Sequence, residues 1–422
     1  MSGAASDRRL PPPGSRQAAF VFIFVTILLD MLALGLILPV LPKLIESFAG
    51  NDTANAAKIY GLFATAWAVM QFLCSPVIGV LSDRFGRRPV VLLSNLGLAL
   101  DYVLMALAPS LAWLLIGRII SGMTSASIAT SYAYVADITP AAQRAAVFGK
   151  VGAAFGAGFV LGPAVGGLLG QIDLRLPFWV AAGLSFANTL YGFLILPESL
   201  PKERRSPFRW RRANPVGALA LLRTRAELAG LSVVNFIAQL AHVALPSVYV
   251  LYAGYRYGWS EFAIGLSLAL VGLCSIVTQW FVIGPVVAHF GERKALMIGF
   301  VMGVLGFVII GLAPTGVLSL LCIPPLSLWG ISNPAIQGLM TRMVTPDQQG
   351  QLQGTINSVN SIAQLAGPFL FTLTFAYFIG ASAPWTIPGA PFLLAGALLL
   401  LTMAIAAWVL APKPAPETTS AS

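Results

Sequence analysis

The stretches "GVLSDRFGRRPVVLLS", residues 79–94, and "GPVVAHFGERKALMIG", residues 284–299, resemble each other and begin 205 residues apart, at positions 79 and 284. The matched pairs are Gly79 with Gly284, Phe85 with Phe290, Gly86 with Gly291 and Arg88 with Arg293. The same spacing relates Gly149, Gly162 and Pro163 to Gly354, Gly367 and Pro368. Agreement at one offset in such separate regions indicates an internal duplication. We therefore expect two related halves.

The composition indicates a membrane protein. The 422 residues are 57% hydrophobic and 9% charged, with a mean hydropathy of +0.83. A water-soluble protein of this composition would expose large apolar patches, whereas a membrane helix needs about 20 apolar residues to cross about 30 Å of hydrocarbon. Twelve such runs are predicted, at 18–41, 59–82, 90–108, 111–135, 146–170, 177–197, 227–251, 262–283, 295–313, 316–340, 352–378 and 388–411.

The predicted fold is an all-α integral membrane protein with twelve transmembrane helices in two pseudo-symmetric six-helix halves. The expected organisation is an N-terminal tail (1–17), a first half (18–198), a polar linker (199–226), a second half (227–411) and a C-terminal tail (412–422). Such duplicated transporters bind substrate near the membrane midplane and expose it alternately to each side as the halves rock. The three cysteines lie inside apolar runs with neither disulfide nor metal spacing, so no metal site is expected.

Lysine and arginine are unevenly distributed between the two predicted sides. With the N-terminus inside, 20 of the 25 basic residues lie in inner segments, four lie outside, and Arg118 lies within a span. Because cytoplasmic loops carry an excess of Lys and Arg, both termini and the linker are predicted to be cytoplasmic, in an inner membrane. The net charge of +10 then reflects topology, and no nucleic-acid partner is expected.

The loop between the second and third spans is a candidate gate. Its residues are Gly79, Asp83, Arg84, Gly86, Arg87 and Arg88. The two glycines permit a tight turn, and the arginines stay with water and anionic headgroups. The positive-inside rule does not require Asp83, so we expect it to bind a helix N-terminus or a guanidinium in one conformation of the transport cycle. The alternative is an aspartate that only stabilises the turn.

The fifth span carries a second motif, made of Gly149, Gly158, Gly162, Pro163, Gly166 and Gly167. Glycines 158, 162 and 166 share one helical face and allow another backbone to approach closely, while Pro163 removes one helical hydrogen bond and permits a bend. Ordinary packing of small residues would explain the glycines alone.

These motifs resemble those of a known family. The loop G-x-L-x-D-R-x-G-R-R looks like the signature loop of the major facilitator superfamily, and the glycine-proline spacing of the fifth span resembles its drug/proton antiporter motif. Three further stretches resemble the tetracycline-resistance branch: "LLDMLALGLILPVLPKLI" (28–45), "LDYVLMALAPS" (100–110) and "NPAIQGLMTRMVTPDQQGQLQGTINSVNS" (333–361). The resemblance implies export of a drug or similar amphipathic compound in exchange for protons, by a chain that works as a monomer.

Three ionisable residues within the first-half spans are candidates for proton coupling. Asp30 lies about twelve residues, or roughly 18 Å, into the first span, and Asp101 lies at a similar depth in the third. Arg118 in the fourth span remains charged, and the resemblance associates an arginine at this place with proton coupling. Two acids and one arginine leave one negative charge, which binds either a proton or a cationic substrate. A permanent salt bridge from Arg118 to either acid is the alternative. We expect Asp30 to be the titrating group.

The second half offers His242 and a polar stripe. His242 either titrates or binds substrate in the transport cycle, or it hydrogen-bonds an adjacent helix. The eleventh span carries Gln353, Asn357, Asn360 and Gln364 on one face, as expected for the wall of a wet cavity or for interhelical hydrogen bonds.

The chain departs from the family it resembles at two positions. Tetracycline pumps carry a histidine in the eighth helix and an aspartate in the ninth, where this chain has Cys274 and Gly303. Either His242 and the first-half acids couple protons without them, or the substrate is not a magnesium-tetracycline cation. Export or proton-coupled import of an endogenous metabolite or siderophore is the alternative function. The sequence has no G-x-x-x-x-G-K-[ST] loop and no catalytic cluster, so we expect neither an ATPase nor an enzyme, with no cofactor and with the proton gradient as energy source.

Overall fold

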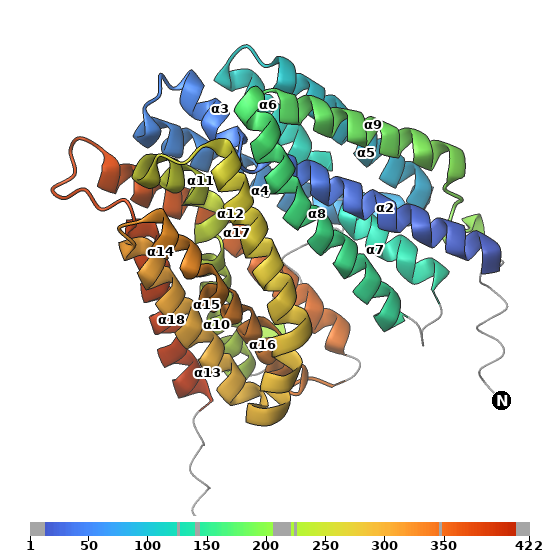
Figure 1. Ribbon diagram of the computed structural model, residues 1–422. Coiled ribbons are helices and arrows are strands. Elements are labelled where there is room, and N and C mark those ends of the chain that lie inside the picture. The colour runs from blue at the N-terminus through green and yellow to red at the C-terminus, as the bar shows by residue number, and fades with distance from the viewer. Residues whose placement is uncertain are drawn as a thin grey trace, which may run out of the picture.

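The computed structural model describes residues 13–124, 127–139, 144–205, 221–222, 226–345 and 348–410, and all regular structure in these ranges is helical. Two groups of helices lie side by side in Figure 1, the first blue to green and the second yellow to red. Residues 1–12 of the predicted N-terminal tail, the predicted C-terminal tail and most of the linker lie outside the described residues, while residues 13–17 form the start of the first helix.

The first half consists of α2 (Pro13–Ile37), α3 (Leu41–Phe48), α4 (Thr53–Phe85), α5 (Arg87–Leu107), α6 (Leu111–Thr124), α7 (Ser127–Ile138), α8 (Arg144–Ile172) and α9 (Leu176–Ile195), followed by the short η2 (Lys202–Arg204). The second half consists of α10 (Ala226–His242), α11 (Ala244–Tyr257), α12 (Glu261–Val277), η5 (Thr278–Val282), α13 (Ile283–Leu312), α14 (Gly316–Leu321), α15 (Ile323–Ser327), η6 (Leu328–Ile331), α16 (Ser332–Thr341), α17 (Gln349–Ile379) and α18 (Ala390–Val409).

These helices confirm the twelve predicted spans. In the described residues, ten helical stretches are long and apolar enough to cross a membrane. One of them, Glu261–Leu312, has 52 residues and turns at Gly291, where φ is +74°, so it supplies two spans. The fourth predicted span is divided between α6 and α7.

Three spans are interrupted where the sequence suggested one continuous helix. The first breaks between Ile37 and Leu41, beside Pro39; the seventh breaks at Val243, before Pro246; the tenth is divided into α14, α15, η6 and α16, which contain Pro324, Pro325 and Pro334. Proline lacks the backbone N–H of a helical hydrogen bond and clashes with the preceding turn, so apolar runs that contain it bend or break. Each interrupted segment is still long enough to span the membrane.

Each half has its own hydrophobic core. One buried cluster joins α10, α11, α12, α13, α16, α17 and α18 and takes Ala57 alone from the first half, while two further clusters lie entirely within the first half. The halves meet along α8 with α12 and along α4 with α17. Because each half buries its own apolar residues, the two can move as units about these contacts.

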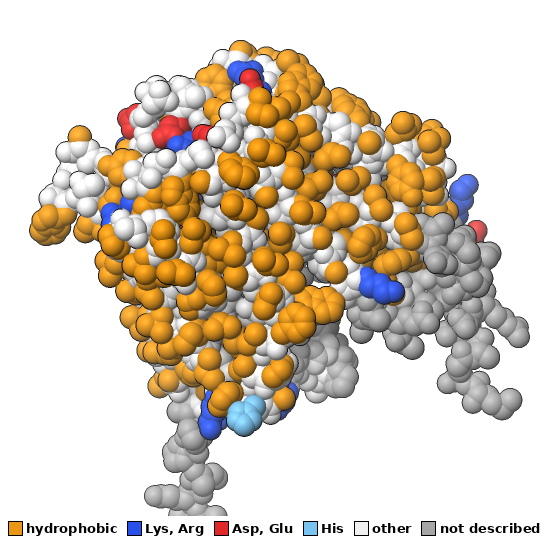
Figure 2. Space-filling view, viewed as in Figure 1, with side chains coloured by type: hydrophobic (Ala, Val, Ile, Leu, Met, Phe, Trp, Pro, Cys, Tyr) orange, Lys and Arg blue, Asp and Glu red, His pale blue; other side chains and the backbone are white. Residues whose placement is uncertain are grey.

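The two ends of the molecule differ in how closely the halves approach. We call the end that carries Arg84, Arg87, Arg88, Arg293, Lys294 and Arg342 the basic face, and the other end the opposite face. Towards the opposite face the halves touch, because a Cβ on Gly265 of α12 would lie 2.2 Å from the carbonyl oxygen of Pro163 in α8. Towards the basic face, Gly149 and Gly152 of α8 have no neighbour within 4 Å of a Cβ position. Figure 2 shows the two lobes separating towards its lower edge, so this conformation is closed at the opposite face.

Candidate substrate cavity

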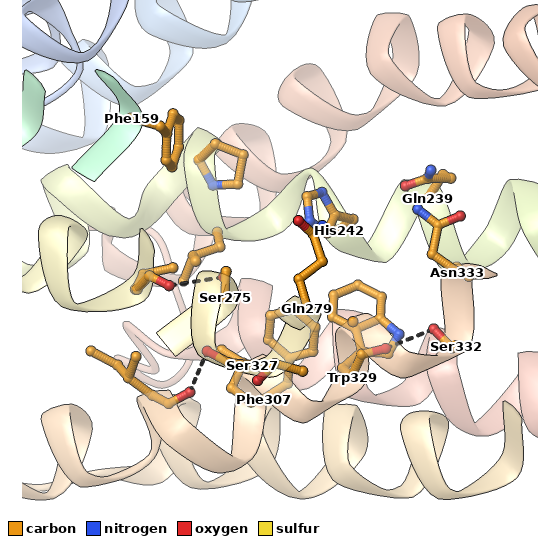
Figure 3. A pocket seen from close by; sticks show the side chains of 18 of the residues that line it. Phe159, Gln239, His242, Ser275, Gln279, Phe307, Ser327, Trp329, Ser332 and Asn333 are labelled. Carbon is orange, nitrogen blue, oxygen red and sulfur yellow. Dashed lines mark hydrogen bonds between the residues drawn. The ribbon is translucent and has the colours of Figure 1, made fainter. Parts of the chain in front are cut away.

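A cavity of about 630 Å³ lies mainly inside the second half. Residues of α10 to α16 supply most of its wall, and Leu38 and Phe159 reach it from the first half. Figure 3 shows side chains from several helices pointing into the same space, among them His242, Gln279 and Trp329. The size is within the range of sites for drug-sized molecules.

Three irregular helical segments build this wall. His242 is the last residue of α10 and precedes the break at Val243; Gln279 belongs to the π-helical η5; Trp329 belongs to the 3₁₀-helical η6. Single π-helical turns and short 3₁₀ stretches within helices often mark functional sites, since they turn side chains away from the regular helical faces. All three segments deliver a cavity-lining residue.

Aromatic rings cluster at the centre of the wall. The rings of His242 and Trp329 lie 5.4 Å apart at an interplanar angle of 50°, and the ring of Phe307 lies 5.4 Å from Trp329 in an edge arrangement. Trp329 is buried, and its indole Nε1–H has no hydrogen-bond partner among the described residues. A buried donor without a partner costs free energy in this conformation.

Apart from His242, the polar side chains of the wall are hydroxyls and amides. The hydroxyls of Ser275, Ser327 and Ser332 donate to backbone carbonyls three or four residues earlier in the chain at 2.8–2.9 Å. The side chains of Gln279 and Asn333 are exposed to the cavity. Amides donate and accept at once, so these groups suit a ligand with carbonyl and hydroxyl groups.

The predicted proton-coupling residues occupy a separate region in the first half. Asp30 of α2 and Asp101 of α5 are both buried, and neither belongs to the described lining of the cavity, nor does Arg118. The amide of Asn188 in α9 donates to Asp30 Oδ1 at 3.5 Å and accepts a hydrogen bond from the Thr26 hydroxyl at 3.0 Å. Of the four predicted coupling residues, only His242 lines the cavity.

Asp101 and Arg118 approach each other without forming an ion pair. Their charges interact, and the Ser121 hydroxyl lies beside the Asp101 carboxylate, yet no ion pair within 4.0 Å joins Asp101 and Arg118 in this conformation. The Arg118 guanidinium instead lies 5.5 Å from the centre of the Trp67 ring. A permanent Asp101–Arg118 salt bridge, the simpler alternative, is absent here.

The polar stripe of α17 lies outside the cavity in this conformation. Gln353, Asn357 and Gln364 are exposed but are not in the described lining, and Asn360 accepts a hydrogen bond from the amide of Asn235 in α10 at 2.8 Å. Asn235 itself lines the cavity, so Asn360 reaches the site through a hydrogen bond between two helices.

Arg87 is the centre of the predicted gating loop. Its guanidinium binds Asp83 at 2.7 Å and Asp137 of α7 at 3.2 Å, and its backbone N–H donates to Glu198 at 2.9 Å. Asp83 thus has a guanidinium partner within its own loop. Gly86 turns the chain with φ of +107°, and a Cβ there would collide with Glu198. The remaining arginines lie near rings, with Arg84 over Phe85 and Arg88 over Phe193.

Sequence reasoning missed Asp137 and Glu198. The 205-residue offset contained a signal for Asp137, because it relates Asp137 to Arg342 and Arg87 to Glu292. Arg342 and Glu292 form an ion pair of 2.9 Å, so the second half repeats the Arg87–Asp137 pair with the charges exchanged. No comparable signal marks Glu198, since the residue 205 positions further on is Met403.

The glycines of the fifth-span motif use two faces of α8. A Cβ on Gly158, Gly162 or Gly166 would meet α2 within 2.9 Å, whereas one on Gly167 would lie 2.3 Å from the carbonyl oxygen of Glu261 in α12. Three glycines therefore hold α8 against its own half, and the fourth holds it against the other half. Gly149 contacts neither.

Comparison with known proteins agrees with this architecture. The Major Facilitator Superfamily profile matches residues 23–368 and 231–422. The chain is 40% identical to tetracycline resistance protein, class C, of Escherichia coli over 91% of this chain and 95% of that one. It is 31% identical to human major facilitator superfamily domain-containing protein 10, over 91% and 92% of the two chains.

Solved structures show the same arrangement. The crystal structure of the human organic anion transporter MFSD10 (TETRAN) superposes with a TM-score of 0.68 at 27% identity, over 94% of this chain and all of that one. The nucleoside transporter NupG superposes with a TM-score of 0.75 at 13% identity, over 94% and 100%, and shares the fold. MFSD10 is an organic anion transporter, and the likeness to NupG shows the fold alone. The chain therefore belongs to the major facilitator superfamily of membrane transporters, as a full-length relative of the tetracycline resistance proteins.

Proposed function

We propose that this protein is a proton-coupled exporter of tetracycline-like or other amphipathic compounds, which works as a single chain by alternating access. The observation that carries the proposal is the 630 Å³ cavity, lined by aromatic rings and neutral amides, in a fold whose halves are closed at the opposite face. The identity to the class C tetracycline resistance protein supports the same kind of cargo.

The distribution of charge supports the proposed orientation in the membrane. We place the basic face and both termini in the cytoplasm, because positive loops stay inside. The described conformation would then receive substrate from the cytoplasm or the inner leaflet. Rocking of the halves about the α8–α12 and α4–α17 contacts would close the basic face and release the substrate outside.

Proton coupling is assigned to the first half. Asp30, held by the Asn188 amide, is the proposed titrating group. Asp101 and Arg118 contribute to the electrostatic potential in this half. His242 lines the cavity and is proposed to connect substrate binding with the conformational cycle. Because the two acids do not line the cavity here, proton and substrate compete through the conformation of the halves and not through direct contact. One inward proton supplies about 2.3 kcal/mol per 100 mV, or roughly fifty-fold accumulation of substrate.

Inverted vesicles that contain the full chain provide the test. With an acidic interior, tetracycline uptake should depend on the gradient, and Asp30→Asn should abolish it while substrate binding persists. Uptake that survives Asp30→Asn would exclude Asp30 as the coupling group. Folded protein that takes up no tetracycline under any gradient would overturn the assigned cargo.

The alternative cargo is an endogenous metabolite or siderophore. Cys274 and Gly303 favour it, because these positions lack the histidine and aspartate that the resemblance associates with tetracycline transport. A gradient-dependent uptake screen with such compounds distinguishes the two cargos.

A further inference from the structure

Apart from His242, the described cavity wall carries no side chain that is charged near neutral pH. Its described lining contains five amide side chains, from Asn235, Gln239, Gln279, Asn333 and Gln337, and no aspartate, glutamate, lysine or arginine. Burying a cation requires a partner of opposite charge, since neutral dipoles recover little of the lost hydration. The wall is therefore suited to a ligand without net positive charge.

Gly303 leaves room for the Trp329 ring. A Cβ at this position would lie 2.9 Å from Cγ of Trp329 and 2.7 Å from a methyl carbon of Leu399. Real Cβ atoms do not approach so closely, so an aspartate cannot occupy this place while the indole does. The packing of Trp329 therefore excludes a carboxylate at this position.

The rings and amides together describe the shape of a ligand. His242 and Phe307 each pack against the Trp329 indole at 5.4 Å, so the wall offers a group of aromatic rings to a flat ring system. The exposed Gln279 amide supplies hydrogen bonds beside those rings. Figure 3 shows Gln279 extending between His242 and Trp329.

We infer that the cavity binds a planar, hydrogen-bonding ligand in its metal-free form, and that it discriminates against the cationic magnesium chelate of the same compound. The inference rests on the proposed function and specifies the cargo's charge state. Trp329 supplies the stacking surface, and Gln279 recognises carbonyl or hydroxyl groups without requiring a bridging cation.

Equilibrium binding of tetracycline to the purified full chain tests this, because tetracycline is planar and exists both free and as a magnesium chelate. The dissociation constant measured with EDTA should be at least ten-fold lower than that measured with saturating Mg²⁺. Tighter binding with Mg²⁺, or no binding in either condition, would overturn the inference.

Matched variants locate the effect. Gln279→Glu places a carboxylate in the cavity with little change of shape, and should weaken metal-free binding and strengthen chelate binding, which reverses the ratio of the two constants. Gln171→Glu makes the same change at the exposed end of α8, remote from the cavity, and should leave the ratio unchanged. Trp329→Leu should reduce metal-free binding at least ten-fold in protein that still folds, although loss of the buried indole lowers its thermal unfolding midpoint. An unchanged ratio in Gln279→Glu, with the protein folded, would contradict the assignment.

Binding and transport separate the two proposals. Metal-free binding without gradient-driven accumulation would reject proton-coupled export and keep the inferred ligand. Accumulation that requires Mg²⁺ would keep export and reject the inferred ligand.

Discussion

Asp137 and Arg342 occupy equivalent positions in the two halves, 205 residues apart, and carry opposite charges. Each binds the residue that follows a turn glycine: Asp137 binds Arg87 at 3.2 Å after Gly86, and Arg342 binds Glu292 at 2.9 Å after Gly291. Both glycines have positive φ, +107° and +74°. The duplication has thus kept the ion pair and its turn while exchanging the signs.

The two pairs should differ in their contribution to stability. Arg87 is 13% exposed and also binds Asp83 and Ser82, whereas Arg342 is 76% exposed and binds Glu292. Arg87→Ala should lower the free energy of unfolding by about 1–3 kcal/mol, because it leaves partly buried carboxylates without a partner. Arg342→Ala should cost less than about 1 kcal/mol. Urea unfolding in detergent measures both, and equal losses would contradict the difference in burial.

Gly86→Ala should destabilise the protein by about 1–3 kcal/mol, since its positive φ strains any side chain and a Cβ would collide with Glu198. Gly79→Ala is the matched control, because Gly79 lies within α4 with no neighbour within 4 Å of a Cβ position. The control should be neutral or slightly stabilising. The midpoints of thermal unfolding compare the two, and similar losses would remove the special role of the turn.

Gly265→Ala should open the closed end of the molecule. The added methyl would lie 2.2 Å from the Pro163 carbonyl oxygen, so α8 and α12 must separate. Spin labels at Ser110 and Ser382, exposed on the opposite face of the two halves, should report a longer mean distance. Gly152→Ala on α8, where nothing lies within 4 Å of a Cβ position, should leave the distance distribution unchanged.

Arg118→Leu should reduce folded yield several-fold, because it leaves the buried Asp101 carboxylate without its nearby cation. The double variant Asp101→Asn/Arg118→Leu removes both charges and should recover most of the folded protein without recovering gradient-driven uptake. Size-exclusion chromatography and vesicle uptake give the two readouts. If adding Asp101→Asn to Arg118→Leu does not restore folding, Arg118 stabilises the protein through its contact with Trp67 instead of Asp101.

The sequence predicted features that depend on composition and local pattern. Apolar runs located the twelve spans, and the constant offset revealed the two halves. The sequence did not predict the η5 and η6 segments, because a π-helical or 3₁₀ turn has the same apolar composition as a regular α-helical turn. The partners of Arg87 were also missed, since Asp137 and Glu198 meet it only after α7 and α9 have packed beside α5. The stripe on α17 was recognised, but only packing determines that Asn360 binds Asn235 while Gln353 stays outside the cavity wall.

The irregular segments that line the cavity all belong to the second half, while the buried acids and Arg118 all belong to the first. Under the proposed function, the second half then selects the transported compound, and the buried charges of the first half couple transport to the proton gradient. Selection for a new drug can act on α10 to α16 without rebuilding the machinery that powers export. A chimaera that joins this first half to the second half of a relative would be expected to change what is pumped and to keep how it is driven.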